Sequence, residues 1–218
     1  MMKEDMHIHS NFSDGLNFPE EIVTTAISIG YEKICIVDHV REGTKWVSDF
    51  ANEVLRLKEK YGSKIEIHSG IEAKVIDLRG NLDLPSDFRA VDFVLAAYHR
   101  IPRGAREYLS PQEITTDKER ALNLWATGMR EVLNNPYVNV IAHPTAIMCK
   151  YNIPISEDII DSILGFSDKC FEINLQHRVP RGKFLAKLLQ GKFKISYGSD
   201  AHSIDELIFW KEIGLRRR

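Results

Sequence analysis

The chain alternates short apolar segments with segments of helical periodicity, and this alternation limits the folds that it can adopt. Strands are expected at seven places: 3–9, 33–37, 65–72, 91–97, 138–142, 170–175 and 194–197. Helices are expected at 19–29, 46–61, 116–134, 156–166, 181–190 and 204–213, and a hairpin excursion at 74–84. Strands that alternate with helices pair in parallel through right-handed crossovers. The pattern therefore predicts an α/β fold, either an open doubly wound sheet or a barrel.

The length and composition fit a single domain that covers residues 1–218. The 218 residues are 44% hydrophobic and carry a net charge of −2, which gives no reason to expect a nucleic-acid partner or a membrane surface. The longest apolar runs are shorter than the ~20 residues of a membrane span, and no secretory signal is recognised. The cysteines Cys35, Cys149 and Cys170 are far apart and fit reduced thiols, so a cytoplasmic location is expected. The oligomeric state stays open.

Histidines concentrate at one kind of place in this pattern. Seven of the eight histidines lie at or just beyond the carboxyl end of an expected strand, and His68 alone lies within one. The polar strand-end residues are His7, His9, Asp38, His39, Glu72, His99, His143, His177, Asp200 and His202. The carboxyl ends of parallel strands meet at one edge of a sheet or one mouth of a barrel. Because every strand contributes, a closed barrel brings these side chains together more readily than a flat sheet.

The residue types at the strand ends indicate a metal site. In a strand, side chains at i and i+2 share a face with Cα atoms ~6.6 Å apart, so His7 and His9, or Asp200 and His202, could bind one ion. One such pair is a weak indication, but six histidines and several carboxylates at one mouth would be unfavourable without a bound cation. Imidazole and carboxylate ligands suit Zn, Mn or Fe. Their number fits up to three divalent ions, with Glu72 bridging two.

Other residues near the strand ends have expected supporting roles. Asp5 shares a strand face with the first two histidines and is expected to orient an imidazole from behind. Asp38, a catalytic candidate, is expected to do the same beside His39. Cys35 lies between two isoleucines and is expected in the core.

The combination of motifs resembles the PHP (polymerase and histidinol phosphatase) family. The residues that carry the resemblance are Asp5-x-His7-x-His9, Ser13-Asp14-Gly15, Asp38-His39, Gly70-x-Glu72, His99, His143-Pro144, Glu172-x-Asn174 and Gly198-Ser199-Asp200-Ala201-His202. The resemblance implies a distorted (β/α)7 barrel of the TIM type with a site for three metal ions. It implies that the first ion is held by His7, His9, Glu72 and Asp200, the second by Glu72, His99 and His143, and the third by Asp14, His39 and His202.

Such a site implies a metal-dependent phosphoesterase, and first of all a phosphatase acting on a small phosphomonoester. A hydroxide that bridges two ions is a strong nucleophile at neutral pH, because coordination can lower the pKa of water to ~7. Arginines of two loops, 98–106 and 177–181, are expected to bind the phosphate oxygens. Arg178 is preferred, because it resembles a phosphate-contacting position of histidinol phosphatases, and Arg100 and Arg103 follow. His177 is a candidate proton donor to the leaving oxygen.

Other functions stay open at this stage. A 3′–5′ exonuclease or phosphodiesterase would use the same ions on nucleotide substrates, and a non-catalytic module could use them for stability. An amidohydrolase also begins with two histidines in a barrel, but neither an eighth strand nor a ligating lysine is found. Histidinol phosphate is one candidate substrate, although the chain is shorter than typical histidinol phosphatases of the family. Specificity depends on the loops 99–115 and 144–155, and Arg216–Arg218 is expected to be a solvated tail.

Overall fold

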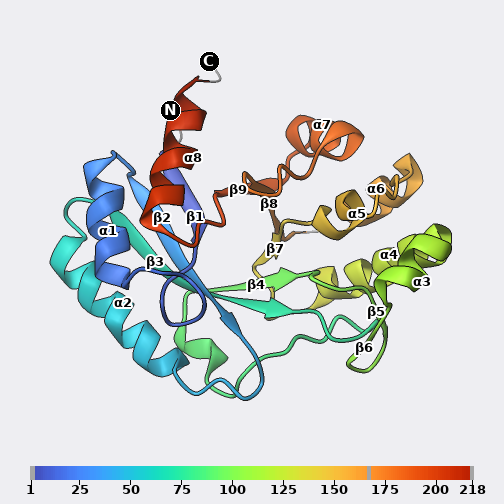
Figure 1. The fold of residues 1–218 in the computed structure, drawn as a ribbon, viewed down its shortest axis with the longest axis horizontal. Coiled ribbons are helices and arrows are strands. Elements are labelled where there is room, and N and C mark those ends of the chain that lie inside the picture. Colours follow the sequence, from blue (N-terminus) through green and yellow to red (C-terminus); the bar gives the residue numbers. More distant parts are fainter. Residues whose placement is uncertain (1–2, 166–167, 217–218) are drawn as a thin grey trace.

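The computed structural model describes residues 3–165 and 168–216, and a seven-stranded sheet forms its centre (Figure 1). The strands are β1 (Glu4–Ile8), β2 (Lys33–Val40), β3 (Glu66–Lys74), β4 (Phe93–Ala97), β7 (Val140–Ala142), β8 (Cys170–Asn174) and β9 (Lys194–Gly198). They are neighbours in this order, and each adjacent pair is parallel. The predicted parallel α/β arrangement is therefore confirmed.

The sheet closes on itself between its first and last strands. Beyond the end of β1, the His9 N–H donates to the Ala201 carbonyl over 2.8 Å, and the Asp200 N–H donates to the His7 carbonyl over 2.8 Å. A parallel bridge also pairs Ile8 with Ala201. These contacts lie at the carboxyl ends of the two strands, so the residues that close the sheet also belong to its histidine-rich mouth. The fold is a distorted (β/α)7 barrel, as the resemblance implied.

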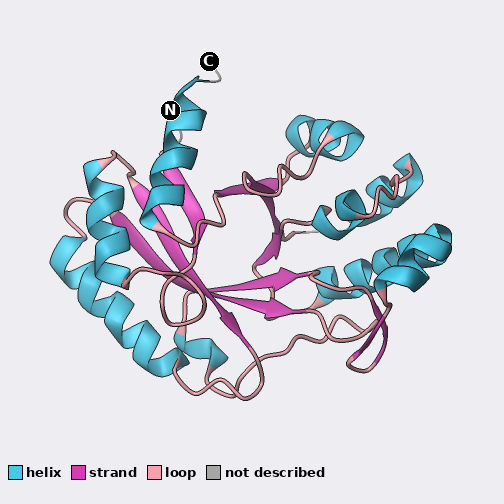
Figure 2. Ribbon diagram, viewed as in Figure 1, coloured by secondary structure: helices cyan, strands magenta, loops and turns pink. Residues whose placement is uncertain are grey.

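Helices surround the strands on the outside of the barrel (Figure 2). They are α1 (Pro19–Ser28), α2 (Val47–Tyr61), α3 (Pro111–Thr116), α4 (Lys118–Asn134), α5 (Ala146–Lys150), α6 (Glu157–Leu164), α7 (Gly182–Gln190) and α8 (Ile204–Arg216). Pro19 opens α1, and the Glu21 carboxylate accepts the Phe18 N–H over 2.8 Å. Asp117 caps α4 by accepting the Arg120 N–H over 2.9 Å. These caps fix where each crossover turns into its helix.

The apolar faces of the helices pack against the outward faces of the strands. Trp125 of α4, Phe50 of α2 and Phe171 of β8 are among the largest fully buried side chains. Fully burying an apolar side chain of this kind stabilises a fold by about 1.5–3 kcal/mol. This outer layer holds the strands in place and leaves the inside of the barrel to other residues.

Small apolar side chains fill one end of the barrel interior. Cys35 and Val37 of β2 and Leu95 and Ala97 of β4 belong to one buried cluster. Gly70 of β3 faces the same space, because a Cβ there would lie 3.1 Å from Cys35 Sγ and 3.0 Å from Val37. The predicted core position of Cys35 is confirmed. Strand side chains alternate with a period of two, so the next inward position on each of these strands is the site of a polar residue.

The structure differs from the prediction in the segments that join the strands. The predicted helix 116–134 is two helices, α3 and α4, because Asp117 leaves the helical conformation with φ −133° and ψ 80°. A short hairpin, β5 (Pro102–Gly104) with β6 (Glu107–Tyr108), and helix α5 occupy segments that were predicted as loops.

The predicted helix 156–166 ends at Leu164, and residue 166 lies outside the described residues, as do Arg217 and Arg218 of the predicted tail. None of the helices in the described ranges combines the length and the apolar character needed to cross a membrane.

Candidate metal centre

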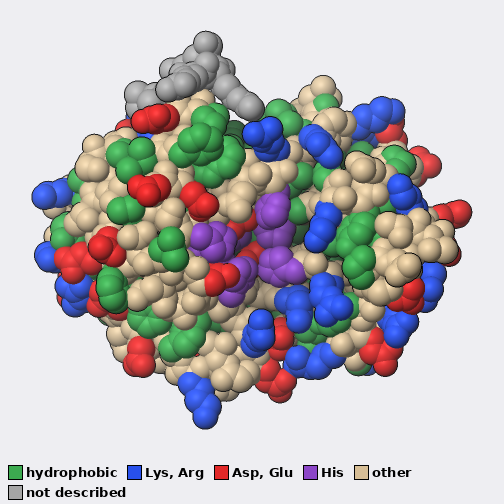
Figure 3. All heavy atoms as spheres, in the orientation of Figure 1, with side chains coloured by type: hydrophobic (Ala, Val, Ile, Leu, Met, Phe, Trp, Pro, Cys, Tyr) green, Lys and Arg blue, Asp and Glu red, His purple; other side chains and the backbone are tan. Residues whose placement is uncertain are grey.

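The polar residues that continue the inward-facing rows meet at the carboxyl ends of the strands. His39 on β2, Glu72 on β3 and His99 after β4 each stand two positions beyond a residue that faces the barrel interior. His7 and His9 join them from the end of β1. Figure 3 shows histidines gathered in a hollow in the middle of one face, with lysine and arginine side chains along one side of them. The sequence-predicted convergence is therefore present.

Glu72 is the carboxylate at the centre of this cluster, and it is 1% exposed. Its Oε1 lies 2.7 Å from His143 Nε2 and 3.4 Å from His99 Nε2. Its Oε2 lies 2.8 Å from His39 Nδ1 and 3.9 Å from His7 Nε2. Imidazoles from four different strands thus face one carboxylate, which is the arrangement expected of a ligand that bridges ions.

Asp200, just beyond β9, faces the first two histidines. Its Oδ1 lies 3.1 Å from His9 Nε2 and 3.8 Å from His7 Nε2, and these two imidazole nitrogens are 3.0 Å apart. Its Oδ2 lies 3.4 Å from His177 Nε2 and accepts from Asn174 Nδ2 over 3.3 Å. His177 was predicted as a proton donor, and its imidazole lies beside a predicted ligand.

A third group lies nearer the surface, around Asp14, whose side chain is 57% exposed. Asp14 Oδ1 lies 3.5 Å from His202 Nε2 and 3.9 Å from His9 Nδ1. Asp14 Oδ2 lies 3.6 Å from His39 Nε2. His39 therefore faces Asp14 through one nitrogen and Glu72 through the other, and it connects the outer group to the buried one.

Four groups among the described residues have ligand atoms that lie within 4.8 Å of one another in each group. The groups are His7 with His9 and Glu72; His39 with Glu72 and His99; His9 with Asp14, His39 and His202; and His143 with His177 and Asp200. All nine residues predicted as ligands fall within these groups, together with His177. The first three groups share His9, His39 or Glu72, and the fourth touches them where His143 meets Glu72 at 2.7 Å and Asp200 meets His9 at 3.1 Å, so ions bound to these groups would lie close together.

Glu172 of β8 supports this cluster from behind. Its Oε1 lies 2.7 Å from His7 Nδ1. Its Oε2 accepts the His143 N–H over 2.5 Å and an Asn174 side-chain N–H over 3.1 Å. A carboxylate on the far nitrogen of a ligating imidazole fixes the tautomer and the orientation of the ring. The sequence motif contained Glu172, but no role was predicted for it. The role of orienting an imidazole was predicted for Asp5 instead.

Asp5 instead binds the backbone, so the prediction that it orients an imidazole is corrected. Its Oδ1 accepts the Ser199 N–H over 2.9 Å and the His7 N–H over 3.3 Å, and the Tyr31 hydroxyl donates to its Oδ2 over 3.5 Å. Burial raises the pKa of Asp5 to about 7. Asp5 therefore ties the end of β1 to the residue that follows β9, at the closure of the barrel.

Asp38 also directs its carboxylate to a partner other than the predicted one. It accepts the Ser10 N–H over 3.0 Å, the Ser10 hydroxyl over 2.5 Å and the Ser13 hydroxyl over 2.6 Å. Successive side chains of a strand point to opposite faces, which separates Asp38 from His39. Asp38 thus holds the turn that carries Asp14. Its direct participation in catalysis remains a prediction.

Burial and neighbouring charges shift the pKa values of the cluster. Burial lowers the pKa of His7, but the carboxylates of Glu172 and Asp200 outweigh burial and raise it well above its usual value. Burial raises the pKa of Glu72, but the surrounding imidazoles outweigh burial and hold it well below its usual value. Burial lowers the pKa of His9 to about 4, so this imidazole is neutral at neutral pH. Ionised Glu72 and neutral His9 are thus in the forms that ligate cations, and a cation bound to His7 would replace its proton.

Unpaired nitrogen atoms test whether the cluster fits cations. His9 Nδ1 and His143 Nδ1 are buried and lack a hydrogen-bond partner in the described chain. Leaving a buried polar atom unpaired costs about 1–3 kcal/mol. His7 Nε2 and His9 Nε2 face each other at 3.0 Å, and the protein alone can place no more than one proton between them. Converging nitrogens beside ionised carboxylates fit divalent cations.

Two residues of the cluster adopt a backbone conformation that favours glycine. His143 has φ 29° and Asp200 has φ 61°. Such a conformation costs a residue other than glycine about 1–3 kcal/mol and is concentrated at functional sites. Its presence at two predicted ligands supports a functional role for both.

The predicted phosphate-binding arginines lie in different surroundings. The Arg100 guanidinium lies 4.7 Å from the centre of the Tyr108 ring. Arg103 forms ion pairs with Glu113 at 2.9 Å and with Glu107 at 3.6 Å, so its charge is already partly compensated. Arg178 is exposed and has φ 54°. A phosphate contact by any of the three remains a prediction.

A cavity of about 660 Å³ lies beside the histidines, and we call it the mouth cavity. It is lined by Tyr98, His99, His143, Ala146, Ile147, Cys149, Lys150, His177 and Arg181. Its two cations are Lys150 at the end of α5 and Arg181 before α7. Arg181 belongs to the predicted arginine loop 177–181 but was not singled out, because the sequence does not show that α5 lies beside this loop.

Gly198 at the end of β9 lies where a side chain would disturb this arrangement. A Cβ there would overlap the Glu172 carboxylate and would lie 2.6 Å from His7 Cβ. We expect Gly198→Ala to destabilise the fold by about 1–3 kcal/mol, as overpacking does, and to lower the metal content. Thermal unfolding and elemental analysis measure both effects. Gly43→Ala is the control, because its Cβ would meet nothing within 4 Å; equal behaviour of the two variants would contradict this expectation.

Comparison with known proteins agrees with this geometry. The PHP domain model matches residues 5–177. A protein named "Probable phosphatase" from Acetivibrio thermocellus is 33% identical over 209 residues, which cover 91% of this chain and 78% of that protein. A histidinol-phosphatase from Lactococcus lactis is 34% identical over 110 residues, which cover 46% of this chain and 40% of that protein.

A solved structure from Listeria monocytogenes, assigned to the histidinol phosphatases, shares the fold. Its TM-score is 0.71 at 17% sequence identity, and the match covers 94% of this chain and 97% of that chain. The PHP model spans the first eight strand-end positions of the predicted site and most of the barrel. This chain therefore belongs to the PHP domain family.

Proposed function

We propose that this protein is a metal-dependent phosphoesterase that hydrolyses a small phosphomonoester. The observation that carries the proposal is the convergence on Glu72 of imidazoles from the ends of four strands. Next to them lies a cavity lined by two cationic side chains, Lys150 and Arg181. Membership of the PHP domain family and the phosphatase names of its relatives support the same chemistry.

The proposed cofactors are up to three divalent ions, and the donor set of imidazoles and carboxylates suits Zn, Mn or Fe. Bound ions would supply an activated water and positive charge for the phosphate oxygens. The residues proposed to hold them are His7, His9, Asp14, His39, Glu72, His99, His143, Asp200 and His202. Glu172 would keep His7 oriented toward the ions.

The phosphate group is proposed to enter the mouth cavity. Arg181 and Lys150 line this cavity together with His99, His143 and His177, so an anion in it would lie near both cationic side chains. An arginine can donate two parallel hydrogen bonds to a phosphate group, which gives geometric specificity as well as attraction. Arg178 in the same loop is the second candidate for this contact.

Hydrolysis also requires a proton for the leaving oxygen. The oxygen of a water molecule bonds to phosphorus as the P–O bond to the alcohol breaks; the water releases one proton, and the departing alkoxide takes up one. We assign this transfer to His177, whose side chain is 43% exposed and lines the mouth cavity. Its Nε2 faces Asp200 Oδ2 at 3.4 Å, which leaves Nδ1 as the nitrogen that can reach the substrate.

Arg181→Ala is expected to lower kcat/KM for phosphomonoesters about 10- to 100-fold, because a hydrogen bond to a charged group contributes about 1.5–3 kcal/mol. Arg178→Ala, measured in parallel, tests the phosphate contact predicted for that residue. Lys187→Ala on α7 is the control, because Lys187 pairs with Asp161 at 2.6 Å outside the mouth cavity. Unchanged kcat/KM in Arg181→Ala would remove Arg181 from the substrate site.

A substrate panel tests the proposal directly. The protein is reconstituted with Mn or Zn, and phosphate release is measured from a broad set of phosphomonoesters that includes histidinol phosphate. The same preparation of Glu72→Gln corrects for contaminating phosphatases. We expect metal-dependent release from at least one ester. Absence of release from the whole set would overturn the proposal, and shortening of single-stranded DNA from its 3′ end would favour the exonuclease function instead.

A further inference from the structure

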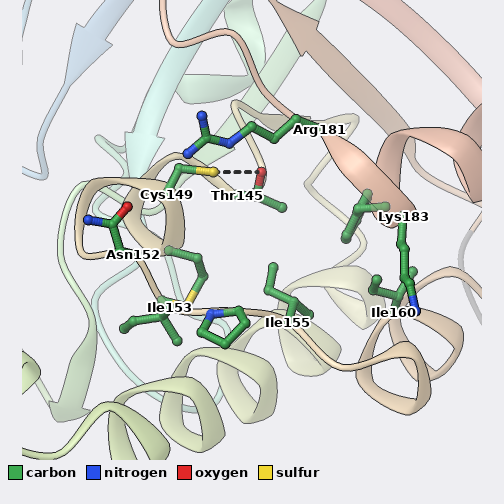
Figure 4. Close-up of a pocket in the computed structure, with 11 residues that line it drawn as sticks. Thr145, Cys149, Asn152, Ile153, Ile155, Ile160, Arg181 and Lys183 are labelled. Atoms are coloured by element: carbon green, nitrogen blue, oxygen red, sulfur yellow. Dashed lines mark hydrogen bonds between the residues drawn. The ribbon is translucent and has the colours of Figure 1, made fainter.

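A second cavity adjoins the mouth cavity. This side cavity has a volume of about 370 Å³ and lies among α5, the loop that follows it, α6 and the start of α7 (Figure 4). Cys149 and Arg181 line both cavities. The two cavities therefore meet at these two side chains.

Six of the eleven residues that line the side cavity are apolar. The apolar lining residues are Met148, Ile153, Pro154, Ile155, Ile160 and Phe184. Of its two cations, Lys183 forms an ion pair with Glu157, whereas no carboxylate in the described ranges pairs with Arg181. A concave apolar wall with a few polar groups at one end is typical of a binding site for a small organic group.

A third cavity, on the side of β2 and β3, has a different character. It has a volume of about 510 Å³, and the carboxylates of Asp14, Glu72 and Asp83 line it together with Arg41 and Lys74. Among the described residues that line this third cavity only Val40 is apolar, whereas six apolar residues line the side cavity. The organic part of a substrate is therefore better accommodated on the side of α5 and α7.

We propose that the side cavity binds the alcohol part of the substrate, and that the substrates are monophosphate esters of compact apolar alcohols, either aryl or branched aliphatic. This inference rests on the proposed function and adds the substrate class to it. The phosphate lies in the mouth cavity, its ester oxygen lies near His177, and the apolar group passes Cys149 into the side cavity. Arg181 stands at the junction, where it contacts the phosphate rather than the apolar group.

Ile155→Trp tests this inference, because the new side chain fills the side cavity without touching the metal centre. Ile155 is half-buried in the loop between α5 and α6. One methylene group in an apolar pocket changes specificity about 10- to 200-fold. We therefore expect kcat/KM for naphthyl phosphate to fall about tenfold or more, and kcat/KM for glycerol phosphate to change less than about twofold. Leu189→Trp, at a position 56% exposed on α7, is the control for added bulk.

A binding measurement on the unmodified protein keeps the test independent of catalysis. Cys149 is half-buried at the junction of the cavities, and Cys170 is half-buried at the start of β8. Naphthyl phosphonate, which is not hydrolysed, is expected to slow alkylation of Cys149 by N-ethylmaleimide and to leave alkylation of Cys170 unchanged. Peptide mass mapping reads both positions in the same sample.

The outcomes separate this inference from the proposed function. Hydrolysis of both esters with an equal effect of Ile155→Trp on each, or with no effect on either, overturns the inference and leaves the function in place. Equal alkylation of Cys149 with and without the phosphonate also overturns it. Protection of Cys149 without hydrolysis of any ester overturns the function and supports the side cavity as a binding site.

Discussion

Glu72→Gln is expected to lower phosphate release by about three orders of magnitude, because it removes charge that is worth several kcal/mol at a metal site. Glu72 faces His143, His99 and His39 within 3.4 Å. Glutamine keeps the shape of the side chain but has one oxygen in place of two and no negative charge. If Glu72 bridges two ions as proposed, the Glu72→Gln variant should lose both of them. Elemental analysis should then show a metal content well below that of the wild type.

Glu66→Gln is the matched control for this variant. Glu66 lies on the same strand, its side chain is 54% exposed, and it faces His68 at 2.6 Å, away from the cluster. The same chemical change there should leave activity and metal content close to wild type. Glu72 does not hold the ions needed for hydrolysis if Glu72→Gln keeps its full metal content, or if its activity stays within about tenfold of wild type.

Glu172→Gln is expected to weaken metal affinity about 10- to 100-fold, the range found for residues that orient a ligand from behind. Glu172 accepts on both oxygens, from His7 Nδ1 at 2.7 Å and from the His143 N–H at 2.5 Å. An amide can accept on one side only, so one of the two contacts becomes unfavourable. Titration with Mn or Zn, followed by activity, measures the shift in the metal concentration that gives half-maximal rate.

The comparison of the two glutamine variants separates holding an ion from orienting its ligand. Excess metal should restore most of the activity of Glu172→Gln, because the ligands themselves remain, and it should not restore that of Glu72→Gln. If saturating metal leaves both variants equally inactive, Glu172 is itself a ligand. An unchanged metal titration curve would show that Glu172 does not position His7.

The barrel and the convergence of most candidate metal ligands were predictable, because both depend on short periodic patterns. The period of two along β2 places His39 on the inward row that begins with Cys35 and Val37, and the same rule applies to Glu72 after Gly70. The closure of the sheet followed from the presence of polar groups at every strand end. These inferences require the strand and its direction but no knowledge of how loops fold.

The partners of individual carboxylates were less predictable. Asp5 and Glu172 both stand near His7, and the sequence cannot show that Glu172 reaches the imidazole while Asp5 reaches backbone amides. That contact joins β1 to β8, which are 165 residues apart in the sequence, and the pairing of β1 with β2 is also irregular between Asp5 and Ile8. The same limit applies to Arg181, because its place beside the mouth cavity depends on helix α5, which is only five residues long.

Phosphate release by this protein is expected to depend on bound metal. Purified protein is assayed on an aryl phosphate as isolated, after treatment with a chelator, and after addition of Mn or Zn to the chelated sample. We expect activity in the first sample, loss in the second and recovery in the third, with no recovery in Glu72→Gln. Phosphate release that survives complete removal of metal, or that Glu72→Gln retains, would contradict this expectation.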